Sequence, residues 1–139
     1  MNKSSDDFLQ GAAFHEAGHV VVAIHLGLAV GEIVINDDGS GRSQIGSPDH
    51  LPLVDRIALC VAGIEAQELY NCHTHPLAAA SDHAKITGLV DGLTEAESLE
   101  RRNAGYLRAL EILKKRRAQV EKLAQHLIDH RRADGLGLN

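Results

Sequence analysis

Aromatic residues are scarce in this 139-residue chain: tryptophan is absent, and tyrosine and phenylalanine contribute two residues each. A hydrophobic core must therefore be built from Leu, Ile, Val and Ala, which supply most of the 44% hydrophobic content. A chain of this length suffices for one buried core. We therefore expect a single domain over residues 1–139, in which residues 134–139 form a flexible tail.

Cysteines and long apolar runs are also rare. Cys60 and Cys72 form no C-x-x-C pair, which favours reduced thiols in a reducing compartment. Residues 1–7 are polar and acidic and lack a signal-peptide pattern. The longest apolar run, around Val20–Ile24, is too short to cross a bilayer. These features predict a cytoplasmic protein without direct membrane insertion.

No strong excess of positive charge marks the chain, whose formal net charge is -5. Residues 97–139 are the more basic part, with 10 basic and 6 acidic side chains. These basic residues alternate with Glu and with apolar positions, which is typical of a solvated amphipathic helix and argues against a nucleic-acid partner. The glycine-containing segment at residues 39–43 lacks the lysine and the spacing of a phosphate-binding loop.

Hydrophobic spacing predicts a mainly helical fold with four to six helices and one small β-hairpin. A strand at 29–36 is expected to expose an edge with which an extended peptide substrate can pair. The expected elements are a helix from Ser5 to about Leu26, a hairpin of strands 29–36 and 42–45, helices at 51–70 and 82–91, and a helical region from the Thr94–Glu97 capping box to about Arg132.

The segment His15-Glu16-Ala17-Gly18-His19 lies inside the first predicted helix. Residues i and i+4 of a helix face the same way, with Cβ atoms roughly 5–6 Å apart, so His15 and His19 can bind one metal ion. Glu16 lies beside them, where it can contact water on that ion without being a ligand. This is the arrangement of the H-E-x-x-H zinc peptidases. A glycine inside a helix, as at Gly18, indicates close packing.

A catalytic zinc ion usually takes three protein ligands and leaves one position for water. Asp82 is the best third ligand, because it follows Ser81 at a predicted helix start and is the only carboxylate in residues 69–90. The competing interpretation of Asp82 is a plain carboxylate at a helix N-terminus. Glu65 and Glu68 are alternative ligands, although a partner of a ligand histidine or a surface position suits them better.

Residues 71–80 are expected to form a loop that carries several histidines. A structural zinc ion bound by Cys72, His73 and His75 is a minor alternative, since their spacing matches no standard zinc motif. The preferred interpretation is a polar loop that borders the active-site cleft.

Several segments, in order, resemble the zinc-peptidase domain of the FtsH-type ATP-dependent membrane proteases. Residues 15–19 are similar to that family's H-E-A-G-H segment, and residues 57–69 resemble its next apolar helix. Residues 80–82 resemble the stretch that ends in its third zinc ligand, an aspartate. Residues 106–113 and 117–127 resemble its closing helices, so the likeness covers most of the chain.

The resemblance implies a zinc-dependent metallopeptidase in which Zn²⁺ is held by His15, His19 and Asp82, with Glu16 as general base on the zinc-bound water. Peptides or unfolded proteins are the implied substrates. Val20, Ile64 and residues 77–81 depart from the family's usual residues. The family's ATPase module and membrane anchor have no counterpart in these 139 residues, so a separate AAA+ ATPase is an expected partner.

Two other classes of function remain open. One is a non-catalytic or partner-dependent zinc-binding interaction module that docks through its basic last helix. The other is a metallohydrolase that acts on a bond other than a peptide bond. Retention of Glu16 favours catalysis, because a purely structural zinc site has no need of it.

Overall fold

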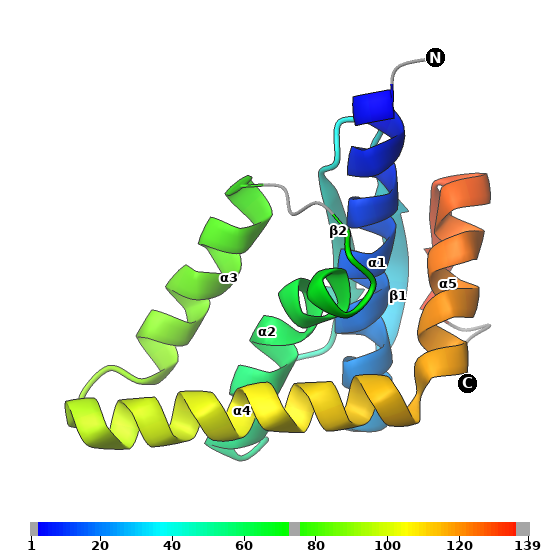
Figure 1. Ribbon diagram of the computed structural model, residues 1–139. Coiled ribbons are helices and arrows are strands. Elements are labelled where there is room, and N and C mark those ends of the chain that lie inside the picture. The colour runs from blue at the N-terminus through cyan, green and yellow to red at the C-terminus, as the bar shows by residue number, and fades with distance from the viewer. Residues whose placement is uncertain (1–2, 73–75, 136–139) are drawn as a thin grey trace.

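The computed structural model describes residues 3–72 and 76–135 of the chain (Figure 1). These residues form a mainly helical fold with a small antiparallel sheet, which confirms the fold class predicted from the sequence. The elements in chain order are α1 (Lys3–His25), β1 (Val30–Ile35), β2 (Gly41–Ile45), α2 (Leu53–Leu69), α3 (Pro76–Leu89), α4 (Glu95–Lys115), α5 (Arg117–His130) and β3 (Arg132–Asp134).

Helix α1 lies at the centre of the fold, between α2 and α5, with the sheet running alongside it (Figure 1). Its small and branched residues Ala13, Ala17, Val20 and Val22 are fully buried. A helix that is apolar on most of its circumference must be covered on several sides. The H-E-x-x-H segment therefore belongs to a helix that is covered on several sides.

Helix α3 differs from its prediction. It begins at Pro76, so Ser81 and Asp82 lie in its second turn and not at its start. Proline is favoured at the first position of a helix, and the alanines at 78–80 are strong helix formers, so the helix starts earlier than a Ser81 cap would place it. The interpretation of Asp82 as a residue of a helix N-terminus was therefore wrong.

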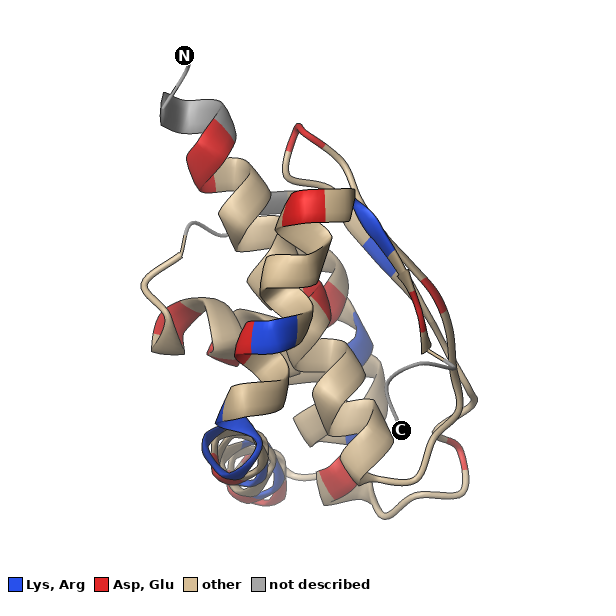
Figure 2. Ribbon diagram, turned by 90° about the vertical axis from the view of Figure 1, so that its right-hand side faces the viewer, with Lys and Arg blue, Asp and Glu red and all other residues tan. Residues whose placement is uncertain are grey.

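Helix α4 begins as predicted, because Thr94 and Glu97 form a reciprocal capping box. The Glu97 N–H donates to Thr94 Oγ1, and the Thr94 N–H donates to Glu97 Oε1, both at 3.1 Å. The helical region predicted to run on to Arg132 is divided at Arg116 into α4 and α5. In Figure 2, where α4 is seen along its axis, Lys and Arg lie beside Asp and Glu on this helix.

The sheet has the strand order β2-β1-β3 and is antiparallel throughout. The third strand was not predicted, and Asp134, expected to open a flexible tail, pairs with Glu32 in β1. Because β1 is paired on both sides, the strand predicted at 29–36 has no exposed edge for a peptide. The outer edge on the side of the hairpin belongs to β2.

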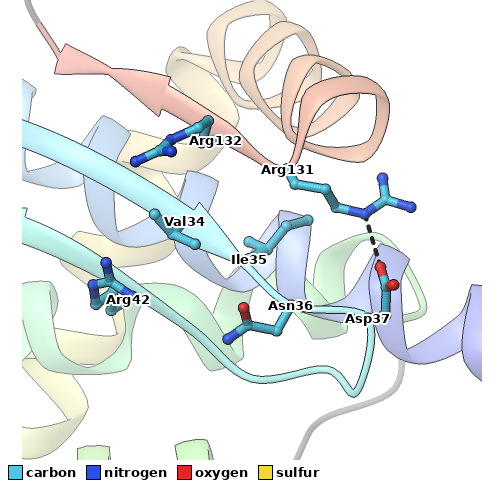
Figure 3. A pocket seen from close by; sticks show the side chains of 7 residues that line it. All are labelled: Val34, Ile35, Asn36, Asp37, Arg42, Arg131 and Arg132. Carbon is cyan, nitrogen blue, oxygen red and sulfur yellow. Dashed lines mark hydrogen bonds and ion pairs between the residues drawn. The ribbon is translucent and has the colours of Figure 1, made fainter.

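The end of α5 is tied to the β1–β2 turn through Arg131, which adopts a left-handed conformation with a φ of 68°. Its carbonyl accepts a hydrogen bond from the Ile35 N–H at 2.9 Å, and its Nε donates to Asp37 Oδ1 at 2.9 Å (Figure 3). The chain reverses there and enters β3. None of the helices in the described ranges is both long and apolar enough to span a bilayer.

Candidate metal centre

Three side chains predicted from the sequence as ligands converge on one point. Nε2 of His15 and Nε2 of His19 lie 3.1 Å and 3.2 Å from Oδ2 of Asp82. The two Nε2 atoms are 3.1 Å from each other. The histidines come from successive turns of α1, and Asp82 reaches them from α3. Within the described part of the chain, these residues form a group that can hold a metal ion.

The other ring nitrogen of each histidine, Nδ1, is held by a hydrogen bond to α2. Gln67 Nε2 donates to the Gly11 carbonyl at 3.0 Å, which turns its Oε1 towards His15. The Nδ1–H of His15 donates to that oxygen at 2.8 Å, and the Nδ1–H of His19 donates to the Leu59 carbonyl at 2.8 Å. With a proton on each Nδ1, both Nε2 atoms present a lone pair to the site.

The donor set fits a cation. Two imidazole lone pairs and a carboxylate oxygen all face one another, and such a group of acceptors requires a metal ion or a proton between them. Imidazole and carboxylate are common zinc ligands, with bonds of about 2.0–2.2 Å. Tetrahedral ligands at such bond lengths are about 3.3–3.4 Å apart. The observed separations of 3.1–3.2 Å are close to that spacing.

The ionisation of the group reflects its burial and its hydrogen bonds. Burial alone raises the pKa of the Asp82 carboxyl. When His15 and His19 are also protonated at Nε2, their hydrogen bonds to Asp82 outweigh burial and hold this pKa well below the usual range. For His15, burial lowers the pKa, while hydrogen bonds to Asp82 and Gln67 and the charge of Glu16 raise it above the ordinary value. Protons therefore compete with a metal ion for His15 Nε2 as the pH falls.

Glu16 lies in a cleft next to the three converging side chains. The cleft has a volume of about 480 Å³, and Glu16, His19 and Asp82 line it together with Ser43 and Lys85. Ser43 Oγ, on strand β2, donates a hydrogen bond of 2.6 Å to Glu16 Oε1. This contact positions the carboxylate of Glu16. Glu16 as a whole is buried, with 7% of its surface exposed.

Two glycines allow α1 and α2 to approach closely at this site. A Cβ atom on Gly63 would lie 2.6 Å from His19 Nε2 and 2.7 Å from two ring atoms of His15. A Cβ atom on Gly18 would lie 2.7 Å from the Cβ atom of Ala66. The packing reason expected for Gly18 is therefore present, and Gly63 has an equally direct one.

Replacing Gly63 by alanine is expected to lower zinc affinity by at least about tenfold, because the new methyl group displaces both imidazoles from their shared point. Competition with a chromogenic chelator measures the dissociation constant. Gly88→Ala is the matched control, since a Cβ atom at this position on α3 meets nothing within 4 Å. Equal zinc affinity in Gly63→Ala and the wild type would contradict the close approach described above.

The structure also separates the alternatives considered from the sequence. Glu65 and Glu68 do not belong to the converging group. The side chain of this helix that hydrogen-bonds to a histidine of the group is that of Gln67, which sequence reasoning missed. Its signal in the sequence is its position four residues after Gly63, and the structure shows that its side chain is buried. His73 and His75 lie outside the described residues, so the alternative zinc site with Cys72 is not addressed by the structure.

No protein-family model matches the chain, and no curated protein matches it either. A functional conclusion must therefore come from the metal centre and the cleft.

Proposed function

We propose that the protein is a zinc-dependent metallopeptidase related to the peptidase domain of the FtsH-type proteases. The observation that carries the proposal is the convergence of two Nε2 atoms and one carboxylate oxygen within 3.2 Å, beside a fourth residue, Glu16, that is not a ligand. Three protein ligands with an adjacent carboxylate are the features of a catalytic zinc site, whereas structural sites have four closed ligands.

Each residue of the site has a distinct task in the proposed hydrolysis. His15, His19 and Asp82 would hold the zinc ion, which would supply Lewis acidity at the site. Glu16 accepts the proton of that water at its carboxylate and passes it to the nitrogen of the leaving amine. Ser43 holds one carboxylate oxygen of Glu16 in place.

The cleft favours an extended peptide as substrate. Residues 41–43 of β2 line the cleft, and Ser43 contacts Glu16, so the strand edge and the proposed catalytic base lie side by side. Backbone pairing of a substrate with β2 would bring its carbonyl groups to the metal centre. The role first expected of strand 29–36 is therefore proposed for β2.

A partner-dependent interaction module is the second candidate, and the surface of α4 favours it. Leu99 and Leu107 on this helix are 55% and 67% exposed, so a partner that docks on α4 would find two apolar contacts there. In this alternative the zinc site stabilises the fold, and α4 docks a separate protein such as an AAA+ ATPase.

Hydrolysis of casein by the purified chain tests the proposal. The zinc-loaded protein is expected to release peptides. Removal of zinc by a chelator should abolish this release, and addition of one equivalent of zinc should restore it. Zinc binding should also raise the melting temperature, because the ion binds the native site and stabilises it by mass action. Zinc that stabilises the fold without any hydrolysis would favour the interaction module.

A further inference from the structure

A second pair of histidines has the same helical spacing as the metal centre. His126 and His130 lie one turn apart on α5, and their ring centroids are 4.6 Å apart. The corresponding distance between the rings of His15 and His19 is 4.7 Å. Both rings on α5 belong to exposed residues, so they can rotate towards a common ion without disturbing the core.

Two features near this pair attract a cation, an acidic side chain and the end of the helix, while Lys122 lines the neighbouring groove. Asp129 directly precedes His130 on α5, and its Oδ1 accepts a hydrogen bond from Gln125 Nε2 at 3.0 Å. His130 is the last residue of the helix, where the backbone carbonyl groups carry partial negative charge. His126 and Asp129 also line a groove of about 820 Å³ between α1, α5 and β3, which solvent and ions can enter.

We propose that His126 and His130 form a second site for zinc or a related divalent transition-metal ion. Imidazole pairs are good ligands for Zn²⁺, Ni²⁺ and Cu²⁺, and water completes the coordination of an exposed ion. At the first centre, Gln67 and Leu59 orient the ligand rings from within the core. The exposed rings on α5 must be ordered by the ion itself, so this site binds more weakly and exchanges faster.

The two sites lie on different sides of the molecule. Helix α3, which carries Asp82, and helix α5 lie on opposite sides of α1 (Figure 1). An ion at His126 and His130 therefore makes no contact with the cleft. The second site stands on its own geometry and does not depend on whether the chain hydrolyses peptides.

Equilibrium dialysis of the full chain against zinc tests this proposal. The wild type is expected to bind one ion tightly and one ion more weakly. His126→Ala and His130→Ala should each weaken the second class by about tenfold or more and leave the first unchanged. His83→Ala is the control, because this exposed residue on α3 has no second histidine one turn away. His15→Ala should show the opposite pattern, with the tight class lost and the weak class retained.

The second site would be overturned if His126→Ala and His130→Ala both bound the weaker zinc ion with wild-type affinity. It would also be overturned if the wild type bound zinc in a single class. Neither result bears on hydrolysis, which is measured separately with casein. A wild type that binds zinc in both classes but does not hydrolyse casein would contradict the proposed peptidase. The second site would still stand.

Discussion

Replacing Glu16 by glutamine is expected to slow casein hydrolysis by about 10²- to 10⁴-fold, the usual contribution of a positioned general base. Glutamine has nearly the same size as glutamate, and its amide oxygen can still accept the hydrogen bond from Ser43 Oγ. It cannot accept a proton from water. Zinc content should stay unchanged, because Glu16 is not among the converging ligand atoms.

Glu65→Gln is the matched control for this experiment. It makes the same chemical change on α2, at a half-buried carboxylate outside the converging group. Wild-type rates are expected for this variant. If Glu16→Gln hydrolysed casein as fast as the wild type, Glu16 would not be the catalytic base, and a contaminating protease would be the first alternative to examine.

Replacing Asp82 by alanine is expected to weaken zinc binding by at least about 100-fold, because it removes one of three ligands and the only negative charge among them. Helix α3 should persist, since alanine is a better helix former than aspartate. Zinc affinity is measured by chelator competition, and circular dichroism reports helix content. Casein hydrolysis should fall in parallel at limiting zinc.

Asp91→Ala provides the control, since this exposed carboxylate follows the end of α3. It should keep wild-type affinity for zinc. An unchanged zinc affinity in Asp82→Ala would refute the role of Asp82 and return the position of third ligand to Glu65 or Glu68.

The histidine pair could be predicted from the sequence because its geometry is local. Helical periodicity alone brings His15 and His19 to one face, and α1 is a regular helix over this segment. Asp82 was chosen as the third ligand, but the helix start expected at Ser81 was wrong. What brings Asp82 to the histidines is the packing of α3 against α2, which is a long-range contact that no local pattern encodes.

The role of Gln67 could have been inferred from its position on the helix. Leu59, Gly63 and Gln67 are spaced four residues apart on α2, so they share one face, and this is the face that contacts the two histidines. Attention to carboxylates instead favoured Glu65 and Glu68. A glutamine in phase with Gly63 on an apolar helix was the better signal for a partner of a ligand histidine.

Strand β3 could not be predicted from its own residues. It has three residues, and it forms only because the left-handed turn at Arg131 directs the chain onto β1, about a hundred positions earlier. This pairing also removed the exposed edge expected for strand 29–36. The strand available for substrate is consequently decided by a contact between two segments about a hundred residues apart.

Anomalous X-ray diffraction at the zinc absorption edge, on crystals of the protein purified without a chelator, tests the central claim most directly. We expect a strong peak within bonding distance of His15 Nε2, His19 Nε2 and Asp82 Oδ2. Zinc present in the crystal but with no peak among these three atoms would contradict the metal centre, and with it the proposed peptidase.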